Sequence, residues 1–259
     1  MTNAKSCYAC NAAATSVEHV PPRCLFPATK DLPKGVSLRN QLITVPSCDA
    51  HNGAKSKDDL FLQYALVFAV PGNRIAKNHF ANAVYRGIDK KPDLANNMFL
   101  NSVPVVAVDT LTGARWESIA IDVDRDRLDA ALEGVGRGLH FHHFQAKWFG
   151  PIRVHAEFLL GSVDPTDARA INEPMEKLVR GFNTIFAKVP YHGANPGVFK
   201  YQVIAAQGST PTMMRLHFYQ GVKVTLIFNE SYGPPRQRPM VRAIHSALSR
   251  PGELARKGL

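Results

Sequence analysis

Cys7–Cys10 (CYAC) and Cys48–His51 (CDAH) bracket the stretch that decides how the first part of this chain folds, and Glu18–Pro22 (EHVPP) lies between them. A Cys-x-x-Cys turn brings two thiolates to one tetrahedral ion, and the second pair supplies two further ligands at the same short spacing. Such a set is typical of structural zinc and leaves no open position for a substrate. The sequence therefore predicts a closed zinc site with the ligands Cys7, Cys10, Cys48 and His51.

Two further features accompany this pattern: the pair Glu18-His19 inside it, and Asn52 directly after it. The arrangement resembles the HNH endonucleases of the His-Me finger (ββα-metal) superfamily, in the branch whose finger is stapled by zinc. The resemblance covers about the first quarter of the chain. It implies that Glu18 and His19 are the acid-His pair that ends the first strand, that Asn52 is the final catalytic position, and that Lys55 matches a common basic position.

The family also carries a central asparagine. Asn40 is the only asparagine between His19 and Cys48. The resemblance assigns Asn40 to that role, although it lies a few residues earlier than the family spacing. His51 stands where the family signature has its second cysteine, an exchange that zinc accepts.

The residue chemistry points the same way. Hydrolysis of a phosphodiester needs a base for the attacking water and a cation to absorb charge. His19 is the natural base, because an unperturbed imidazole titrates close to neutral pH. Glu18 and Asn52 offer oxygen ligands that suit Mg²⁺ or Mn²⁺ better than zinc. We expect basic side chains next to the site to contact nucleic-acid phosphates, namely Arg23, Lys55 and Lys57.

Each assignment has a simpler alternative. The cysteines could be buried thiols, although two paired spacings in one short segment favour a metal. Glu18-His19 could be a surface pair, and Asn52 could cap the following helix, a common role for Asn. Cys24 has apolar neighbours and no partner at metal spacing, so we assign it to the core. We assign His140, His142 and His143 to packing or capping rather than to a second metal site.

Composition limits the classes of protein. The chain has 259 residues and a net charge of +10, which favours a polyanionic partner without separating DNA from RNA. The apolar runs are shorter than the roughly 18 residues that span a bilayer. The first residues reach Cys7 before an apolar signal core can form. Cysteines at metal spacing fit a reducing compartment, so we expect a cytoplasmic protein that binds nucleic acid, with DNA favoured, and no membrane.

The remaining pattern predicts an α+β fold: a zinc-bound ββα-metal finger followed by a larger α+β domain with a mainly antiparallel sheet. Helices are expected over 59–69, 74–86, 124–139 and 173–187. Strands are expected over 103–109, 116–122, 152–158, 201–206, 213–219 and 222–229. The predicted units are a finger nuclease domain (1–59), a helical connector (60–100), an α+β domain (101–233) and a basic, proline-containing tail (234–259).

Two classes of function follow from these observations. The first is an HNH-type metal-dependent endonuclease with one structural zinc and a catalytic Mg²⁺ or Mn²⁺, in which 101–233 supplies specificity or a surface for a homodimer or protein partner. The second is a non-catalytic zinc module that binds nucleic acid or protein. A zinc module needs only the four ligands and leaves Glu18-His19 and Asn52 unexplained, so the sequence favours the nuclease.

Overall fold

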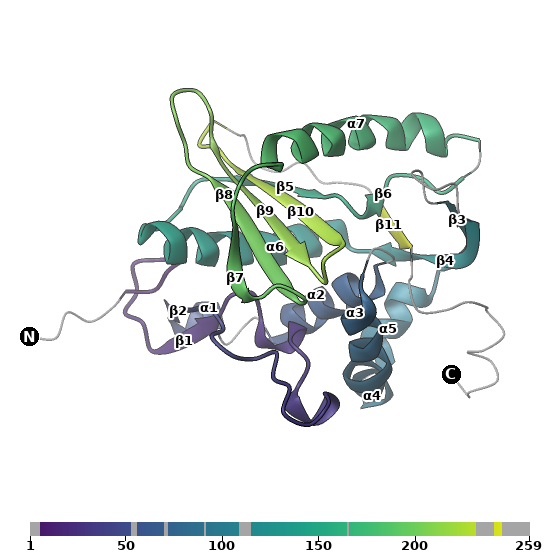
Figure 1. The fold of residues 1–259 in the computed structure, drawn as a ribbon, viewed down its shortest axis with the longest axis horizontal. Coiled ribbons are helices and arrows are strands. Elements are labelled where there is room, and N and C mark those ends of the chain that lie inside the picture. The colour runs from purple at the N-terminus through teal and green to yellow at the C-terminus, as the bar shows by residue number, and fades with distance from the viewer. Residues whose placement is uncertain are drawn as a thin grey trace, which may run out of the picture.

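The computed structural model describes residues 6–52, 56–69, 72–90, 92–108, 115–164, 166–231 and 241–244. The fold is α+β, as predicted (Figure 1). All of the strand pairs between the named strands of these ranges are antiparallel. No helix in the described ranges is long and apolar enough to cross a membrane.

The N-terminal part is a two-stranded hairpin followed by helices. Its elements are β1 (Ser16–His19), β2 (Thr44–Ser47), α1 (Asp49–Asn52) and α2 (Ser56–Phe68), with 3-10 turns η1 (Arg23–Leu25) and η2 (Thr29–Asp31) between the two strands. In the hairpin His19 lies opposite Thr44 and Ser16 lies opposite Ser47. Residues 61–68 of α2 are fully enclosed, as the continuous apolar run predicts.

A helical run follows α2. It consists of α3 (Arg74–His79), the π-helical segment η3 (Phe80–Val84), α4 (Tyr85–Lys90) and α5 (Pro92–Phe99). Asn73 caps α3, because its Oδ1 accepts hydrogen bonds from the backbone N–H groups of Ile75 and Ala76 at 2.9 and 3.2 Å. The helix expected over 74–86 is therefore present, and the sequence did not predict α5.

The main sheet has five strands in the order β5-β10-β9-β8-β7. Its strands are β5 (Ile152–Ala156), β7 (Tyr191–Asn195), β8 (Phe199–Ile204), β9 (Thr212–Phe218) and β10 (Val222–Phe228). Helices α6 (Arg125–Phe144) and α7 (Ala168–Phe186) cover its two faces (Figure 1). Gly136 of α6 lies against Leu226, whereas Phe182 and Phe186 of α7 pack with Ile227, and adjacent strand residues point to opposite faces.

A second sheet has four strands in the order β3-β4-β11-β6. These strands are β3 (Val103–Val108), β4 (Arg115–Val123), β6 (Leu159–Leu160) and β11 (Val241–Ile244). The β3–β4 hairpin was predicted. The sequence did not predict β6, β7 or β11, and β11 falls inside the segment expected to be a basic tail. The rest of that segment, from residue 234 on, lies outside the described residues.

The hairpin shares one core with the larger part of the chain. A single cluster of buried side chains contains Val20, Val45 and Cys48 together with Leu226 and Phe228 of the main sheet. Gly138 of α6 makes this contact close, because a Cβ built there would lie 2.6 Å from Cγ2 of Val20. The division of the chain into four units stays a prediction, but the hairpin packs directly against α6 through buried side chains.

A buried chain of hydrogen bonds also joins the parts. Gln63 Nε2 donates to the Cys24 carbonyl at 2.7 Å and lies 3.1 Å from His79 Nε2. The other ring nitrogen of His79 lies 3.3 Å from the Tyr219 hydroxyl, which donates to the Leu25 carbonyl at 2.7 Å. A neutral His79 with its proton on Nδ1 satisfies every link. The chain thus connects η1, α2, α3 and the β9–β10 turn.

Candidate metal centre and hairpin site

The four predicted zinc ligands meet at the base of the hairpin. Cys7 and Cys10 lie in the turn before β1, Cys48 follows β2, and His51 lies in the short helix α1. Backbone hydrogen bonds fix both turns: Cys7 N–H donates to the Ala12 carbonyl at 2.9 Å, and His51 N–H donates to the Cys48 carbonyl at 3.0 Å. The two turns are held together by the Tyr8 N–H, which donates to the Pro46 carbonyl of β2 at 2.8 Å.

Their ligand atoms all lie within 4.8 Å of one another. The Cys10 and Cys48 sulfurs are 3.7 Å apart, and His51 Nδ1 is 3.2 Å from the Cys48 sulfur and 3.7 Å from the Cys7 sulfur. A tetrahedral ion with zinc–sulfur bonds of about 2.3 Å needs edges of about 3.7 Å between sulfurs and about 3.5 Å between sulfur and nitrogen. The four residues therefore form a metal-binding set that fits Zn²⁺.

The larger part of the chain supports this centre from outside. Lys147, in the segment after α6, donates from Nζ to the Cys10 carbonyl at 2.7 Å and lies 3.4 Å from Asn11 Oδ1. Three thiolates around one Zn²⁺ carry a net charge of about −1. The lysine ammonium anchors the turn beside the first ligand pair, and it would offset that charge when the set holds zinc.

Cys24 is not a ligand, in agreement with its assignment to the core. Its thiol donates to the Asp59 carbonyl at 3.4 Å, far along the chain from the ligand turns. Burial, followed by the nearby Asp59 charge, raises the pKa of Cys24 to about 12. The thiol therefore stays protonated, whereas zinc binds the thiolate.

His19 ends β1 and is partly buried. Burial, followed by the positive charges of Arg23 and Arg39, lowers the pKa of His19 below its ordinary value. The side chain is therefore neutral at pH 7, the state that a general base requires. His19 and Glu18 line a small pocket between β1, the start of α2 and the side of α6, together with Val20, Pro22, Asp58, Asp59, Ala130, Ala131 and Val135.

Glu18 and Asn52 each contact one of two serines that lie opposite each other in the hairpin. The Glu18 carboxylate accepts from the Ser47 hydroxyl at 3.3 Å and from the Tyr8 hydroxyl at 3.4 Å. Asn52 Nδ2 donates to the Ser16 hydroxyl at 2.8 Å, and Ser16 lies opposite Ser47 in the hairpin. The amide atom that a hard cation would use is the other one, Oδ1.

Of the other predicted site residues, one lies close to His19, one does not line its pocket, and the side chains of two are not described. Arg23, in η1, is exposed and close enough to lower the pKa of His19. Asn40 lies in the loop before β2, where its carbonyl accepts from Asn195 Nδ2 at 2.8 Å, and it does not line the pocket with His19. Lys55 lies outside the described residues, and the side chain of Lys57 is not among the described ones.

Three charged residues around His19 were not predicted from the sequence. Arg39 acts on the pKa of His19 and is oriented by its Nε, which donates to the Phe26 carbonyl at 2.9 Å. Asp58 and Asp59 open α2 and line the pocket, and Asp58 is paired with Arg127 of α6 at 2.8 Å. Asp58 and Asp59 could have been noticed, because acidic residues are favoured in the first turn of a helix. Arg39 lies in a loop, where no sequence pattern indicates its position.

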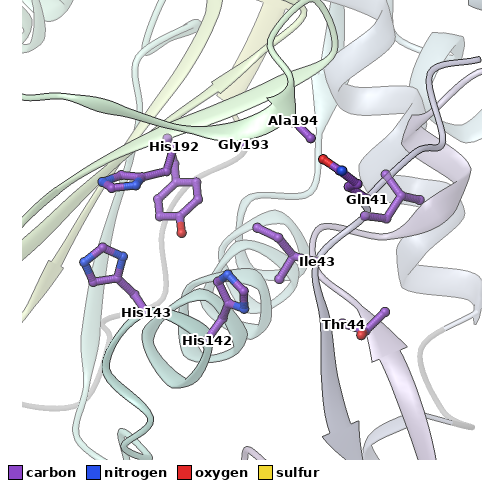
Figure 2. A pocket seen from close by; sticks show the side chains of 10 residues that line it. Gln41, Ile43, Thr44, His142, His143, His192, Gly193 and Ala194 are labelled. Carbon is purple, nitrogen blue, oxygen red and sulfur yellow. The ribbon is translucent and has the colours of Figure 1, made fainter.

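The three histidines at the end of α6 divide into two kinds. His140 is buried against Phe144 and Phe228, and its Nδ1 lies 2.9 Å from the Ala146 carbonyl, which agrees with a packing role. His142 and His143 are instead exposed and line a second pocket. Figure 2 shows both rings with His192 from β7, next to the 41–44 segment that leads into β2.

No protein-family model matches the chain, and neither a curated protein nor a solved structure matches it at a significant level. What the chain does is therefore inferred from its own residues and their geometry. Those residues provide four side chains that could hold a metal, a neutral histidine beside a carboxylate, and two arginines close enough to lower the pKa of that histidine.

Proposed function

We propose that the chain is an HNH-type, metal-dependent endonuclease that hydrolyses phosphodiester bonds in nucleic acid, with DNA the favoured substrate. The observation that carries the proposal is the arrangement on one hairpin: a Cys3His set, a neutral His19 at the end of β1, and Asn52 directly after the ligand His51. This order of elements supports a zinc-stapled ββα-metal finger made of β1, β2 and the helices that follow.

In this proposal the zinc has a structural role. Cys7, Cys10, Cys48 and His51 would supply all four of its ligands, so no position would be left for water or substrate. Its ligands join the turn before β1 to the end of β2 and to α1. It therefore fixes the spacing between Glu18-His19 on one strand and Asn52 beyond the other.

The chemistry is assigned to His19. A neutral imidazole next to the scissile phosphate accepts the proton of the attacking water. The arginines that keep His19 neutral, Arg23 and Arg39, also place positive charge where a phosphate would bind. The same two charges thus serve both the protonation state of the base and the attraction of the substrate.

Glu18 and Asn52 would hold the catalytic Mg²⁺ or Mn²⁺ through oxygen atoms, which suits these hard cations. Their contacts to Ser47 and Ser16, which are paired across the hairpin, support a common ligand face. When bound, the ion would stabilise negative charge on the phosphate and the leaving oxygen.

One observation favours the non-catalytic alternative. The hydrogen bonds of Glu18 to Tyr8 and Ser47 give that carboxylate a structural role that needs no ion. A zinc module that only binds nucleic acid or protein would keep these bonds and would not need a neutral His19 beside two arginines.

Purified protein incubated with supercoiled plasmid and with RNA, in Mg²⁺, in Mn²⁺ or without added divalent ion, tests the proposal. We expect divalent-dependent nicking of DNA. Asn52→Ala should need a higher Mg²⁺ concentration and regain part of its rate in Mn²⁺, because only the catalytic ion is weakened. A protein that binds nucleic acid and zinc but cuts neither substrate with any ion would support the non-catalytic module instead.

A further inference from the structure

The second pocket, here named the histidine pocket, lies where the hairpin meets the end of α6 and the edge of the main sheet (Figure 2). The hairpin contributes Gln41, Leu42, Ile43 and Thr44, α6 contributes His142 and His143, and the sheet contributes His192, Gly193, Ala194 and Tyr201. Three of the ten histidines of the chain therefore meet in one hollow: two neighbours from α6 and one from β7, about 50 residues later.

The imidazole rings are close to one another. The ring centroids of His143 and His192 are 5.0 Å apart at 80°, and those of His192 and Tyr201 are 5.2 Å apart. His142 and His143 are exposed and His192 is half-buried, so solvent and solute reach all three. The hollow is open to a polymer and does not enclose a small molecule.

Its polar groups suit an anion. The side chains of Gln41, Thr44, the histidines and Tyr201 can all donate hydrogen bonds, and no carboxylate is present among the described residues that line it. The β7–β8 ladder shifts register between His192 and Asn195, so Gly193 and Ala194 leave the regular pairing at the pocket wall. Irregular strand segments of this kind occur often beside binding sites.

The pocket adjoins the proposed catalytic residue. Thr44, which lines it, is the direct cross-strand partner of His19 in the hairpin. Directly opposed residues of an antiparallel pair project from the same face, with Cβ atoms about 5 Å apart. Thr44 therefore connects the hairpin face that carries His19 with the wall of the histidine pocket.

The titration of the pocket is set by its own groups. Burial, followed by the charge of His192, lowers the pKa of His142. Burial also lowers the pKa of His143, followed by the charges of His192, His142 and His140. Tyr201 of β8 faces the rings, whereas the neighbouring Lys200 lies over Tyr191, with Nζ 3.7 Å from that ring centroid. The rings of His142 and His143 are therefore mainly neutral at pH 7, and a bound anion favours their protonation.

We propose that the histidine pocket binds a backbone phosphate of the same nucleic-acid strand that is cleaved at His19. This inference rests on the proposed nuclease function, which places the scissile phosphate at His19. It assigns the larger domain a direct part in substrate binding, and it makes that binding stronger as the pH falls.

The test uses the full chain with His19→Ala, so that binding is measured without cleavage. The affinity for a short fluorescent DNA strand is measured by anisotropy at constant ionic strength, with the pH lowered from about 7.5 to about 5.5. We expect binding to tighten about tenfold, the effect of one charge-assisted contact. In the His19→Ala background, the triple variant His142→Gln/His143→Gln/His192→Gln should lose this pH dependence. The control variant His155→Gln, which changes a histidine outside the pocket, should keep it.

Strands in which one phosphate is replaced by an uncharged methylphosphonate identify the contact. We expect one position at which the replacement removes the pH effect. Equal pH effects in the triple variant, or an effect that no replacement removes, would overturn the proposal. The proposal would also be overturned if the three histidines bound a second equivalent of zinc that the triple variant does not bind. It would be overturned as well if inorganic phosphate competed with DNA although DNA binding did not depend on pH.

The two proposals fail in different ways. Pocket-dependent binding by a wild-type protein that cuts nothing would leave the phosphate contact and remove the nuclease. Cleavage by a protein whose triple variant binds DNA as the parent does would leave the nuclease and remove the pocket. Unchanged zinc content and circular dichroism confirm that the triple variant is folded, as expected for changes at accessible side chains.

Discussion

At the scale of single residues, the proposed activity depends on the protonation state of His19. Its partial burial and the charges of Arg23 and Arg39 all favour the neutral imidazole. A neutral imidazole can act as a base at pH 7. The negative charge of a bound phosphate raises the pKa of the imidazole, so nearby positive charge is needed to keep it neutral. The two arginines meet this need, because they repel a proton, and they also attract a phosphate.

Removing one of these charges should move the pH profile. In wild-type protein, kcat/KM should fall on the acid side through a pKa below 6.5, as His19 becomes protonated. Arg23→Gln removes a positive neighbour, so the pKa of His19 rises and the acid limb moves to higher pH. Cleavage rates measured across the pH range test this, with Lys30→Gln as the control. An acid limb that stays in place or moves to lower pH in Arg23→Gln contradicts the assignment.

At the scale of elements, long segments with a clear period could be predicted from the sequence. The helices around residues 61–68 and 125–144 and the β9–β10 hairpin follow from apolar patterns alone. β6 has only two residues, and β11 lies in a segment rich in proline and arginine; both form because edges of neighbouring strands need partners. A local pattern does not contain that information.

The metal centre should be required for the hairpin to fold. Purified under reducing conditions, the protein should contain about one zinc per chain, and Cys48→Ser should lose it, because ligand binding and local folding are one equilibrium. Elemental analysis and limited proteolysis measure both effects, with the core thiol variant Cys24→Ser as the control that keeps its zinc. Zinc-free wild-type protein that was never exposed to chelator would contradict the Cys3His assignment.

The contact between α6 and the hairpin should be sensitive to a single methyl group. Gly138→Ala places a Cβ 2.6 Å from Cγ2 of Val20, so we expect a loss of about 1–3 kcal/mol and a lower cleavage rate as the hairpin shifts. Gly181→Ala on α7 meets nothing within 4 Å and should stabilise by about 0.5–1 kcal/mol. Denaturant unfolding of both variants tests this contrast. Equal effects of the two changes would show that the contact is loose.

At the scale of the whole molecule, the site is assembled by long-range contacts. The cluster of Cys7, Cys10, Cys48 and His51 could be predicted because the spacing within each pair is local, whereas the role of His19 stays a prediction. That Arg39 lies close to His19, and that His142 and His143 line a pocket with the hairpin, could not be predicted from the sequence. It depends on which end of α6 meets the hairpin, and this is set by Gly138, Val20 and the shared core.

The buried chain through His79 should make stability depend on pH. Burial, followed by Arg39, lowers the pKa of His79 to about 4, whereas the unfolded state keeps a value near 6.5. The unfolded chain therefore binds more protons as the pH falls through this range, and stability should drop by up to about 3 kcal/mol. His79→Gln should flatten the dependence, and His155→Gln should not. Stability that is constant between about pH 7 and pH 4.5 would mean that His79 does not couple the parts.

The most direct test of the central claim is the single-turnover rate of DNA cleavage by His19→Ala, measured beside the wild type with zinc content determined on the same samples. If His19 is the general base, the rate should fall by about 10²–10⁴-fold at every Mg²⁺ and Mn²⁺ concentration. Zinc should remain at about one per chain, because His19 is not a ligand. Cleavage that survives His19→Ala intact would contradict the account.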